Sequence, residues 1–239
     1  MMHGTREDLR QRADYTHKFN IKTGRHGWLR LTPAYSVKVV EEIVTKYGPS
    51  LSILDPFCGT GTTALSAVNH GHRAATTDIN PFLIWLATAK TADYSSEVIA
   101  QANQAGKAAL DLARREIVKP VAEPPIHKIE RWWSEPARRF LCHLKAAIED
   151  VAGQSGPVAD LLNVAFCRTL IKISSAAFNH QSMSFKDEAQ CLFDLDPEAS
   201  AVFLEDLAFV LGGAKDNPPG DASVLLGDAR NLTNCLDGK

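Results

Sequence analysis

A short apolar run followed by an acid and a glycine-rich turn, between residues 51 and 63, constrains the fold of this chain most strongly. It reads Leu-Ser-Ile-Leu-Asp-Pro-Phe-Cys-Gly-Thr-Gly-Thr-Thr and continues into a helix-compatible stretch at residues 64–68. Gly59 and Gly61 have no side chain to block a ligand, and glycine can adopt positive φ. The helix start directs free N–H groups towards an anion bound there. The pattern therefore predicts a strand–loop–helix unit whose loop lets a ligand approach the backbone.

A second predicted strand, residues 73–78, ends in Asp78. A ribose-binding acid is expected about 20 residues after a nucleotide-binding glycine loop, and Asp78 lies at that distance. A carboxylate at the tip of a strand can accept hydrogen bonds from both ribose hydroxyls. The loop and the acid together indicate a nucleotide-like cofactor.

Two other interpretations of the loop stay open on these residues alone. The glycines could simply make a tight turn, or they could bind a dinucleotide, because Gly59-x-Gly61-x-x-Ala64 loosely fits that fingerprint. Against the dinucleotide, Asp55-Pro56-Phe57 stands where the fingerprint brings a glycine directly off the strand.

The nine residues from Asp55 to Thr63 resemble the S-adenosylmethionine-binding motif of amino-group DNA methyltransferases, which methylate the exocyclic nitrogen of adenine or cytosine. The resemblance implies an α/β fold, here a partial Rossmann-like methyltransferase sheet with about three strands and a large helical insertion. It also implies S-adenosylmethionine as cofactor and DNA as partner. The residues that it implies for the cofactor site are Thr32, Pro33, Asp55, Phe57, Cys58, Gly59, Gly61, Thr62, Asp78, Ile79, Asn80 and Asp228.

The length, the apolar segments and the cysteine content agree with an ordinary globular protein. A chain of 239 residues is long enough for one sizeable domain or one domain with an insertion. No apolar run approaches the roughly 18 residues of a membrane span, and the polar N-terminus lacks a signal-peptide core. The five cysteines are scattered without a Cys-x-x-Cys pair, which favours reduced thiols in a cytoplasm over disulfides or a metal site.

We expect four segments along the chain. Residues 1–30 form a basic arm whose interleaved aromatic residues suit either phosphate contacts and base stacking or docking on the core. Residues 31–93 form the cofactor-binding α/β half, in which Thr32 is the predicted N-cap and Pro33 the first residue of a helix. The helix start at Thr32 and Pro33 resembles the family motif that helps to hold the methionine end of the cofactor, and an ordinary capped helix is the alternative.

The third segment, residues 94–221, is predominantly helical and is a possible target-recognition insertion. Within it, residues 174–186 are rich in hydrogen-bonding side chains, so we interpret them either as a functional loop near the DNA or as a plain surface loop. The fourth segment, residues 222–239, begins with a third strand that leads to Asp228. The family has a comparable Gly-Asp-Ala pattern, whose acid often contacts the cofactor adenine.

The catalytic motif of the family, an Asp-, Asn- or Ser-Pro-Pro-aromatic segment, is absent from these 239 residues, so the catalytic residues are unknown. We therefore expect the cofactor-binding part of an enzyme, with the first strand at an exposed sheet edge. Three alternatives stay open: a split enzyme in which a second polypeptide supplies the remaining strands, a truncated gene product, and an inactive remnant.

The expected function is methyl transfer to an exocyclic amine of cytosine or adenine in DNA, in a restriction–modification or defence setting. An inactive regulatory half that pairs with a catalytic partner and a fragment of an RNA base methyltransferase remain alternatives.

Overall fold

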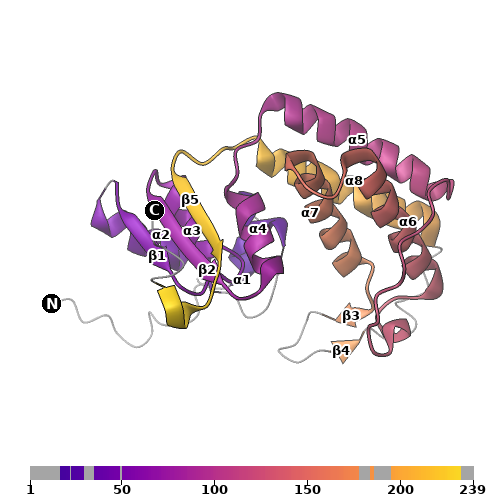
Figure 1. Cartoon of the computed structure of the whole chain (residues 1–239), viewed down its shortest axis with the longest axis horizontal. Helices are drawn as coiled ribbons and strands as arrows, with labels where there is room; N and C mark the ends of the chain where they lie inside the picture. Colours follow the sequence, from indigo (N-terminus) through magenta and orange to yellow (C-terminus); the bar gives the residue numbers. More distant parts are fainter. Residues whose placement is uncertain are drawn as a thin grey trace. The chain divides into compact units, whose positions relative to one another are not determined.

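The computed structural model describes residues 17–21, 23–29, 35–48, 50–177, 184–185 and 195–232. The chain divides into two compact units. One comprises Met1–Asp93 with Asp216–Lys239, and the other comprises Tyr94–Lys215. Figure 1 shows strands in the first unit and mainly helices in the second. No helix in the described part of the chain is long and apolar enough to cross a membrane.

The first unit is built on a parallel sheet in the order β1-β2-β5, with strands β1 (Ser52–Asp55), β2 (Arg73–Asp78) and β5 (Asp221–Leu226). The register pairs Ser52 with Arg73 and Arg73 with Asp221, so the amino ends of the three strands lie together at one end of the sheet and the carboxyl ends at the other. β1 lies at an edge of this described sheet, where Leu54 is 47% exposed. The predicted α/β class with a partial Rossmann-like sheet is confirmed.

Helix α3 (Thr62–Asn69) connects β1 to β2 and supplies the core of this unit. Its small and branched apolar residues pack on the sheet around Ala74, with Ile53 and Ala222 at the margin. Helix α4 (Pro81–Thr91) follows β2 and begins where the Asn80 side chain accepts a hydrogen bond from Phe82 N. Asn with Pro directly after it is a strong helix-start signal, which explains why this boundary can be predicted.

The segment before the sheet differs from its prediction at the start of one helix. Helix α2 (Val37–Val44) is capped by Ser36, whose hydroxyl accepts from Lys38 N at 3.1 Å, and Asn20 Oδ1 accepts from Val37 N at 2.8 Å. The predicted cap of this helix at Thr32 is therefore wrong, because Ser36 and the sequence-distant Asn20 accept from the first N–H groups of the helix. Thr32 and Pro33 lie outside the described residues.

The basic arm contributes two described elements, α1 (His17–Asn20) and the 3₁₀ helix η2 (Gly24–Trp28). Arg25, His26 and Trp28 are all buried, with Trp28 at 0% exposure. Another 3₁₀ turn, η3 (Thr45–Tyr47), follows α2 directly. The described part of the arm thus docks its aromatic residue on the rest of its unit.

The second unit contains helices α5 (Ser96–Arg114), α6 (Glu135–Ala152), α7 (Pro157–Lys172) and α8 (Leu195–Ala214), with the 3₁₀ turn η4 (Ile129–Arg131) before α6. Serine side chains cap α5 and α6, and Gly153 ends α6, as their sequences predict. Gly106 of α5 lies so close to α7 and α8 that a Cβ there would be 2.5 Å from Leu207 and 3.1 Å from Leu162. This glycine therefore permits the close packing of the three helices.

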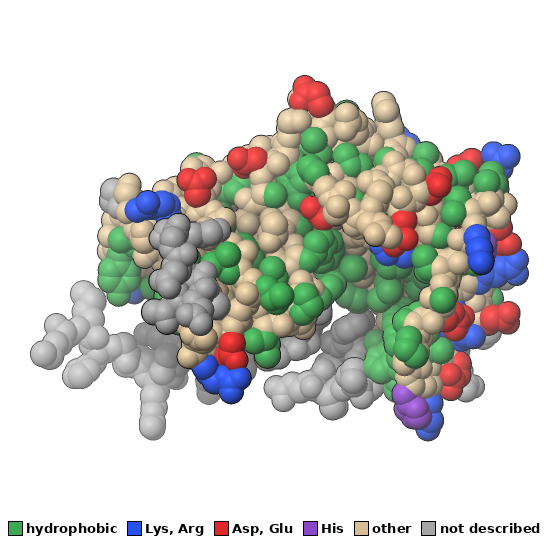
Figure 2. Space-filling view, viewed as in Figure 1, with side chains coloured by type: hydrophobic (Ala, Val, Ile, Leu, Met, Phe, Trp, Pro, Cys, Tyr) green, Lys and Arg blue, Asp and Glu red, His purple; other side chains and the backbone are tan. Residues whose placement is uncertain are grey.

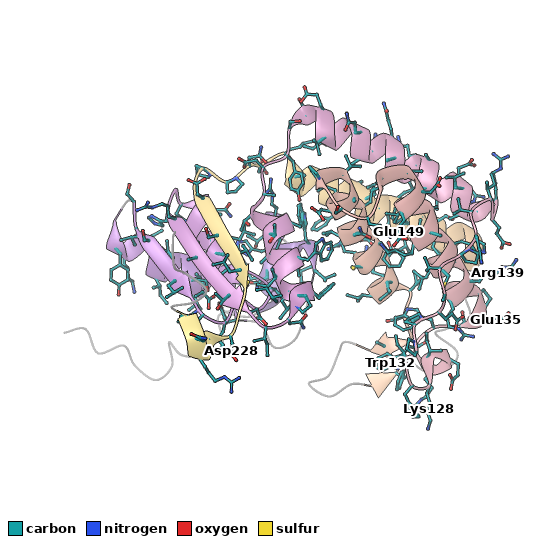
Figure 3. All side chains as sticks on the ribbon, viewed as in Figure 1. Lys128, Trp132, Glu135, Arg139, Glu149 and Asp228 are labelled. Atoms are coloured by element: carbon teal, nitrogen blue, oxygen red, sulfur yellow. The ribbon has the colours of Figure 1, made fainter. Side chains whose placement is uncertain are left out.

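Residues 174–186 contain a short antiparallel pair, β3 (Ala176–Ala177) and β4 (Ser184–Phe185). The Phe185 ring packs against Trp132 with centroids 5.0 Å apart, and the Arg131 guanidinium lies 4.5 Å from its centroid. Figure 3 shows Lys128 and Trp132 beside this pair. The remainder of the predicted loop, residues 178–183 and 186, lies outside the described residues.

Candidate cofactor site

Three loops meet where the parallel strands end. The loop after β1 is tied to β2 because Cys58 N donates to Thr77 O at 2.8 Å and Thr77 Oγ1 donates to Pro56 O at 3.2 Å. The loop after β5 is tied to β2 by Gly227 N, which donates to Asp78 O at 3.0 Å. Ligands of open parallel sheets bind at this edge. The topology therefore brings the glycine loop and the predicted acids to the same edge.

The glycine loop depends on backbone conformations that side chains disfavour. Gly59 has φ of +50° and Gly61 has φ of +75°. A Cβ on Gly61 would lie 2.9 Å from the Cβ of Ala87 in α4, whereas among the described residues a Cβ on Gly59 would meet no atom closer than Phe57 O at 3.9 Å. Gly61 thus allows α4 to approach the loop, and Gly59 leaves open space in front of the backbone.

Asp78 is fixed by backbone donors on both sides. Its Oδ2 accepts from Gly59 N at 3.0 Å and its Oδ1 accepts from Asn80 N at 2.9 Å. The carboxylate that the sequence assigns to ribose is thus in direct contact with the glycine loop. Each carboxylate oxygen has further acceptor capacity, so ribose hydroxyls can be added without breaking these bonds.

Asp55 presents an oxygen atom without a partner. Its Oδ1 accepts from Phe57 N at 3.0 Å, while Oδ2 is buried and has no hydrogen-bond partner among the described residues. Buried carboxylate oxygens normally have partners, and an exception needs an explanation. A ligand ammonium or hydroxyl donating to Oδ2 would supply one.

Large apolar side chains are exposed at this edge of the sheet. Phe57, Ile79 and Leu226 are 73%, 72% and 61% exposed, and they follow or end β1, β2 and β5 respectively. Figure 2 shows hydrophobic side chains close to an acidic and a basic group at the lower end of this unit. An apolar rim beside the acid that is predicted to bind ribose suits the faces of an adenine ring.

Asp228 lies beyond the tip of β5 (Figure 3) and pairs with a neighbouring residue. Its carboxylate caps the 3₁₀ turn η6 (Ala229–Asn231) and accepts from Arg230 Nε at 3.0 Å. The hydrogen bonds from Arg230 lower the pKa of Asp228 to about 2. The side chain is therefore an anionic acceptor at any ordinary pH, as a contact with an adenine amino group requires.

Two of the predicted site residues are mostly enclosed. Cys58 is 2% exposed, and burial raises the pKa of its thiol to about 11, so it is a packing residue and not a nucleophile. Thr62 is 6% exposed and begins α3. A ligand would meet both residues mainly through their backbone.

Two further residues of this region were not predicted from the sequence. Tyr35 OH lies 2.7 Å from Thr63 Oγ1, and Lys90 Nζ donates to Thr60 O at 3.0 Å. No local pattern marks Tyr35. Lys90 follows the apolar residues Leu86, Ala87 and Ala89 at positions that share the buried face of α4, and that periodicity was the available signal.

These residues fit S-adenosylmethionine. Asp78 can hold the ribose hydroxyls, the apolar rim with Asp228 can hold the adenine, and the orphaned Asp55 Oδ2 can accept from the ammonium. The open face at Gly59 allows the chain of the ligand to lie on the loop backbone.

Part of the chain is similar to known DNA methyltransferases. Residues 37–116 match the family described as D12 class N6 adenine-specific DNA methyltransferase. The chain is also similar to the Type II methyltransferase M.BsoBI of Geobacillus stearothermophilus, with 34% identity over 68 residues, which cover 28% of this chain and 13% of that protein. No solved structure matches the chain. Neither comparison supports a second polypeptide. The resemblance to amino-group DNA methyltransferases predicted from the glycine loop is confirmed, and the family match includes that loop, β2 and α4.

Proposed function

We propose that the unit containing β1, β2 and β5 binds S-adenosylmethionine for methyl transfer to an exocyclic amine of DNA. The observation that carries the proposal is the hydrogen bond between Gly59 N and Asp78 Oδ2, because it joins the cofactor loop to the ribose acid in one arrangement. The description of the matched family favours the N6 of adenine over the N4 of cytosine. We place the activity in a restriction–modification or defence setting.

The bound cofactor would supply an activated methyl group, which the target amine attacks directly. The contribution of this chain is to bind and orient the donor, and such orientation can account for a large part of a barrier reduction. Asp78 and Asp228 hold the nucleoside at two points, and the loop backbone and Asp55 receive the amino-acid end.

Isothermal titration calorimetry with S-adenosylmethionine tests the binding. We expect saturable heat for the wild-type protein and an affinity lowered at least about tenfold by Asp78→Ala, since the ribose hydroxyls lose a charged acceptor. Asp221→Ala is the matched control, because Asp221 is an exposed acid at the opposite end of the sheet. Absence of heat with the wild-type protein would contradict the proposal.

A methylation assay tests the substrate. DNA and RNA are incubated with the protein and cofactor labelled in the methyl group, then digested to nucleosides and separated by mass. Because these 239 residues lack the Pro-Pro-aromatic motif, the assay is run with and without a polypeptide that carries it, and the proposal predicts N6-methyladenine from DNA when the motif is supplied. Label in cytosine, or only in RNA, would contradict adenine in DNA as the methyl acceptor. Cofactor binding without any methyl transfer would favour the regulatory alternative.

A further inference from the structure

Lys90 is a buried cation directly behind the glycine loop. The residue is 1% exposed, and its Nζ donates to the carbonyl of Thr60, which lies between the two glycines of the loop. Its own carbonyl accepts from Arg25 Nη1 at 3.0 Å, so η2 covers the end of α4 at this point. The ammonium is therefore enclosed by the loop, by α4 and by the docked arm.

No carboxylate forms an ion pair with Lys90 among the described residues. The titratable groups that influence it electrostatically are Cys58 in the loop and His26 in η2. Burial lowers the pKa of Lys90 to about 8, and burial together with the Lys90 charge lowers the pKa of His26 to about 3. The surroundings thus keep His26 neutral and leave the ammonium as the charged group.

A buried charge without a counterion is unfavourable for folding, and an apolar side chain of similar volume would usually be tolerated there. Its position next to a predicted ligand loop therefore indicates a role in binding. Because the ammonium holds the Thr60 carbonyl against α4, that acceptor is directed away from a ligand on the open side. The N–H groups of Cys58, Gly59 and Gly61 already donate within the protein, so the donors that remain for an anion are those of Thr60 and of the first turn of α3.

We propose that Lys90 is a positioning residue of the cofactor site, which fixes the Thr60 carbonyl and supplies the positive charge that attracts the carboxylate of S-adenosylmethionine. The inference rests on the proposed function. The cofactor carries an ammonium, a sulfonium and one carboxylate, and only the carboxylate is attracted by a cation behind the loop. The effect of Lys90 is accordingly confined to the amino-acid end of the ligand.

The test compares two ligands and two variants. Lys90→Met removes the charge at nearly equal length, and Leu86→Met is the control, because Leu86 is a fully buried residue of the same helix. Calorimetry is performed with S-adenosylmethionine and with 5′-methylthioadenosine, which keeps the nucleoside and lacks the amino acid. Thermal unfolding is recorded for each variant by circular dichroism.

We expect Lys90→Met to weaken binding of S-adenosylmethionine about tenfold or more, which is typical of a lost charge-assisted contact, and to change binding of 5′-methylthioadenosine less than about twofold. Its unfolding temperature should not fall below that of Leu86→Met. Equal losses for both ligands would show a merely structural lysine and overturn the inference, as would unchanged binding of S-adenosylmethionine. Absence of binding by the wild-type protein would overturn the proposed function and the inference together.

Discussion

The two units of the chain each bury a charged side chain, and they treat that charge differently. Asp206 in α8 is 0% exposed and accepts from Arg168 Nε at 2.8 Å, from Lys172 Nζ at 2.7 Å and from Thr169 Oγ1 at 3.2 Å. Lys90 in α4 is equally enclosed but has a carbonyl as its hydrogen-bond acceptor and no described carboxylate. Asp206 is compensated within the protein, whereas Lys90 would be compensated by an anionic ligand.

The difference suggests what each buried charge contributes. In the helical unit the compensated aspartate links α7 to α8, so its loss should affect stability. In the α/β unit the uncompensated lysine contributes little to stability, so its loss should affect binding.

Asp206→Ala should cause the largest loss of stability. Removal of the acid breaks its ion pair with the partly buried Arg168, and breaking a buried ion pair typically costs about 3–5 kcal/mol of unfolding free energy. Urea unfolding of the full chain measures the loss, with Glu205→Ala, an exposed neighbouring acid, as the control. A loss equal to that of the control would contradict the structural role of Asp206.

Gly61→Ala should destabilise the α/β unit more than Gly59→Ala does. Both positions have positive φ, which costs a non-glycine residue about 1–3 kcal/mol, but a Cβ on Gly61 also collides with Ala87. Gly61→Ala should have a lower unfolding temperature than Gly59→Ala, and calorimetry should show that both variants lose cofactor affinity. A Gly59 variant with normal affinity would indicate that the ligand does not lie on the loop backbone.

Between about pH 8 and 10.5, the stability of the free protein should rise with pH, whereas its affinity for the cofactor should fall. The pKa of Lys90 is lowered by burial from 10.5 to about 8, so the unfolded state binds more protons between these values and stability rises with pH there. The slope attributable to one group is at most about 1.4 kcal/mol per pH unit. Cofactor affinity should fall over the same range, because the attracting charge is lost.

The comparison needs Lys90→Met at each pH, because the α-amino group of the cofactor titrates near pH 8 as well. We expect the rise in stability and the Lys90-dependent part of the fall in affinity to disappear in the variant. Identical pH profiles for the wild-type protein and Lys90→Met would show that the lysine is not the titrating group.

Asp228→Asn should have the smallest effect, lowering cofactor affinity about threefold, as expected for one exposed hydrogen bond. Asp221→Asn, at the other end of β5, should leave affinity unchanged. Because Arg230 lowers the pKa of Asp228 to about 2, the contribution of Asp228 should persist on acidification until the pH approaches that value. Carboxyl carbon shifts in an NMR titration measure the midpoint directly.

The sequence predicts the parts of the site that depend on local signals. Residues 73–78 form the predicted strand, and Asn80 with Pro81 start α4 with capping signals that lie within a few residues. It also places Asp55, Asp78 and Asp228 at one edge, since parallel strands end together.

Contacts distant in sequence explain what the sequence did not predict. Asn20 hydrogen-bonds Val37 N and helps to fix the start of α2, and Thr60 lies 30 residues before the lysine that holds it. Arg25 reaches Lys90 O from the docked arm, a contact that no local charge pattern reveals. Such contacts depend on tertiary packing, which overrides local propensity.

The most direct test of the cofactor site is an amide NMR titration of the full chain with S-adenosylhomocysteine, the product form of the donor. We predict the largest shift changes at Gly59, Gly61 and Ile79, with residues of α6 and α7 nearly unchanged. Changes concentrated in the helical unit, or none at saturating ligand, would contradict the assignment of the glycine loop as the cofactor site.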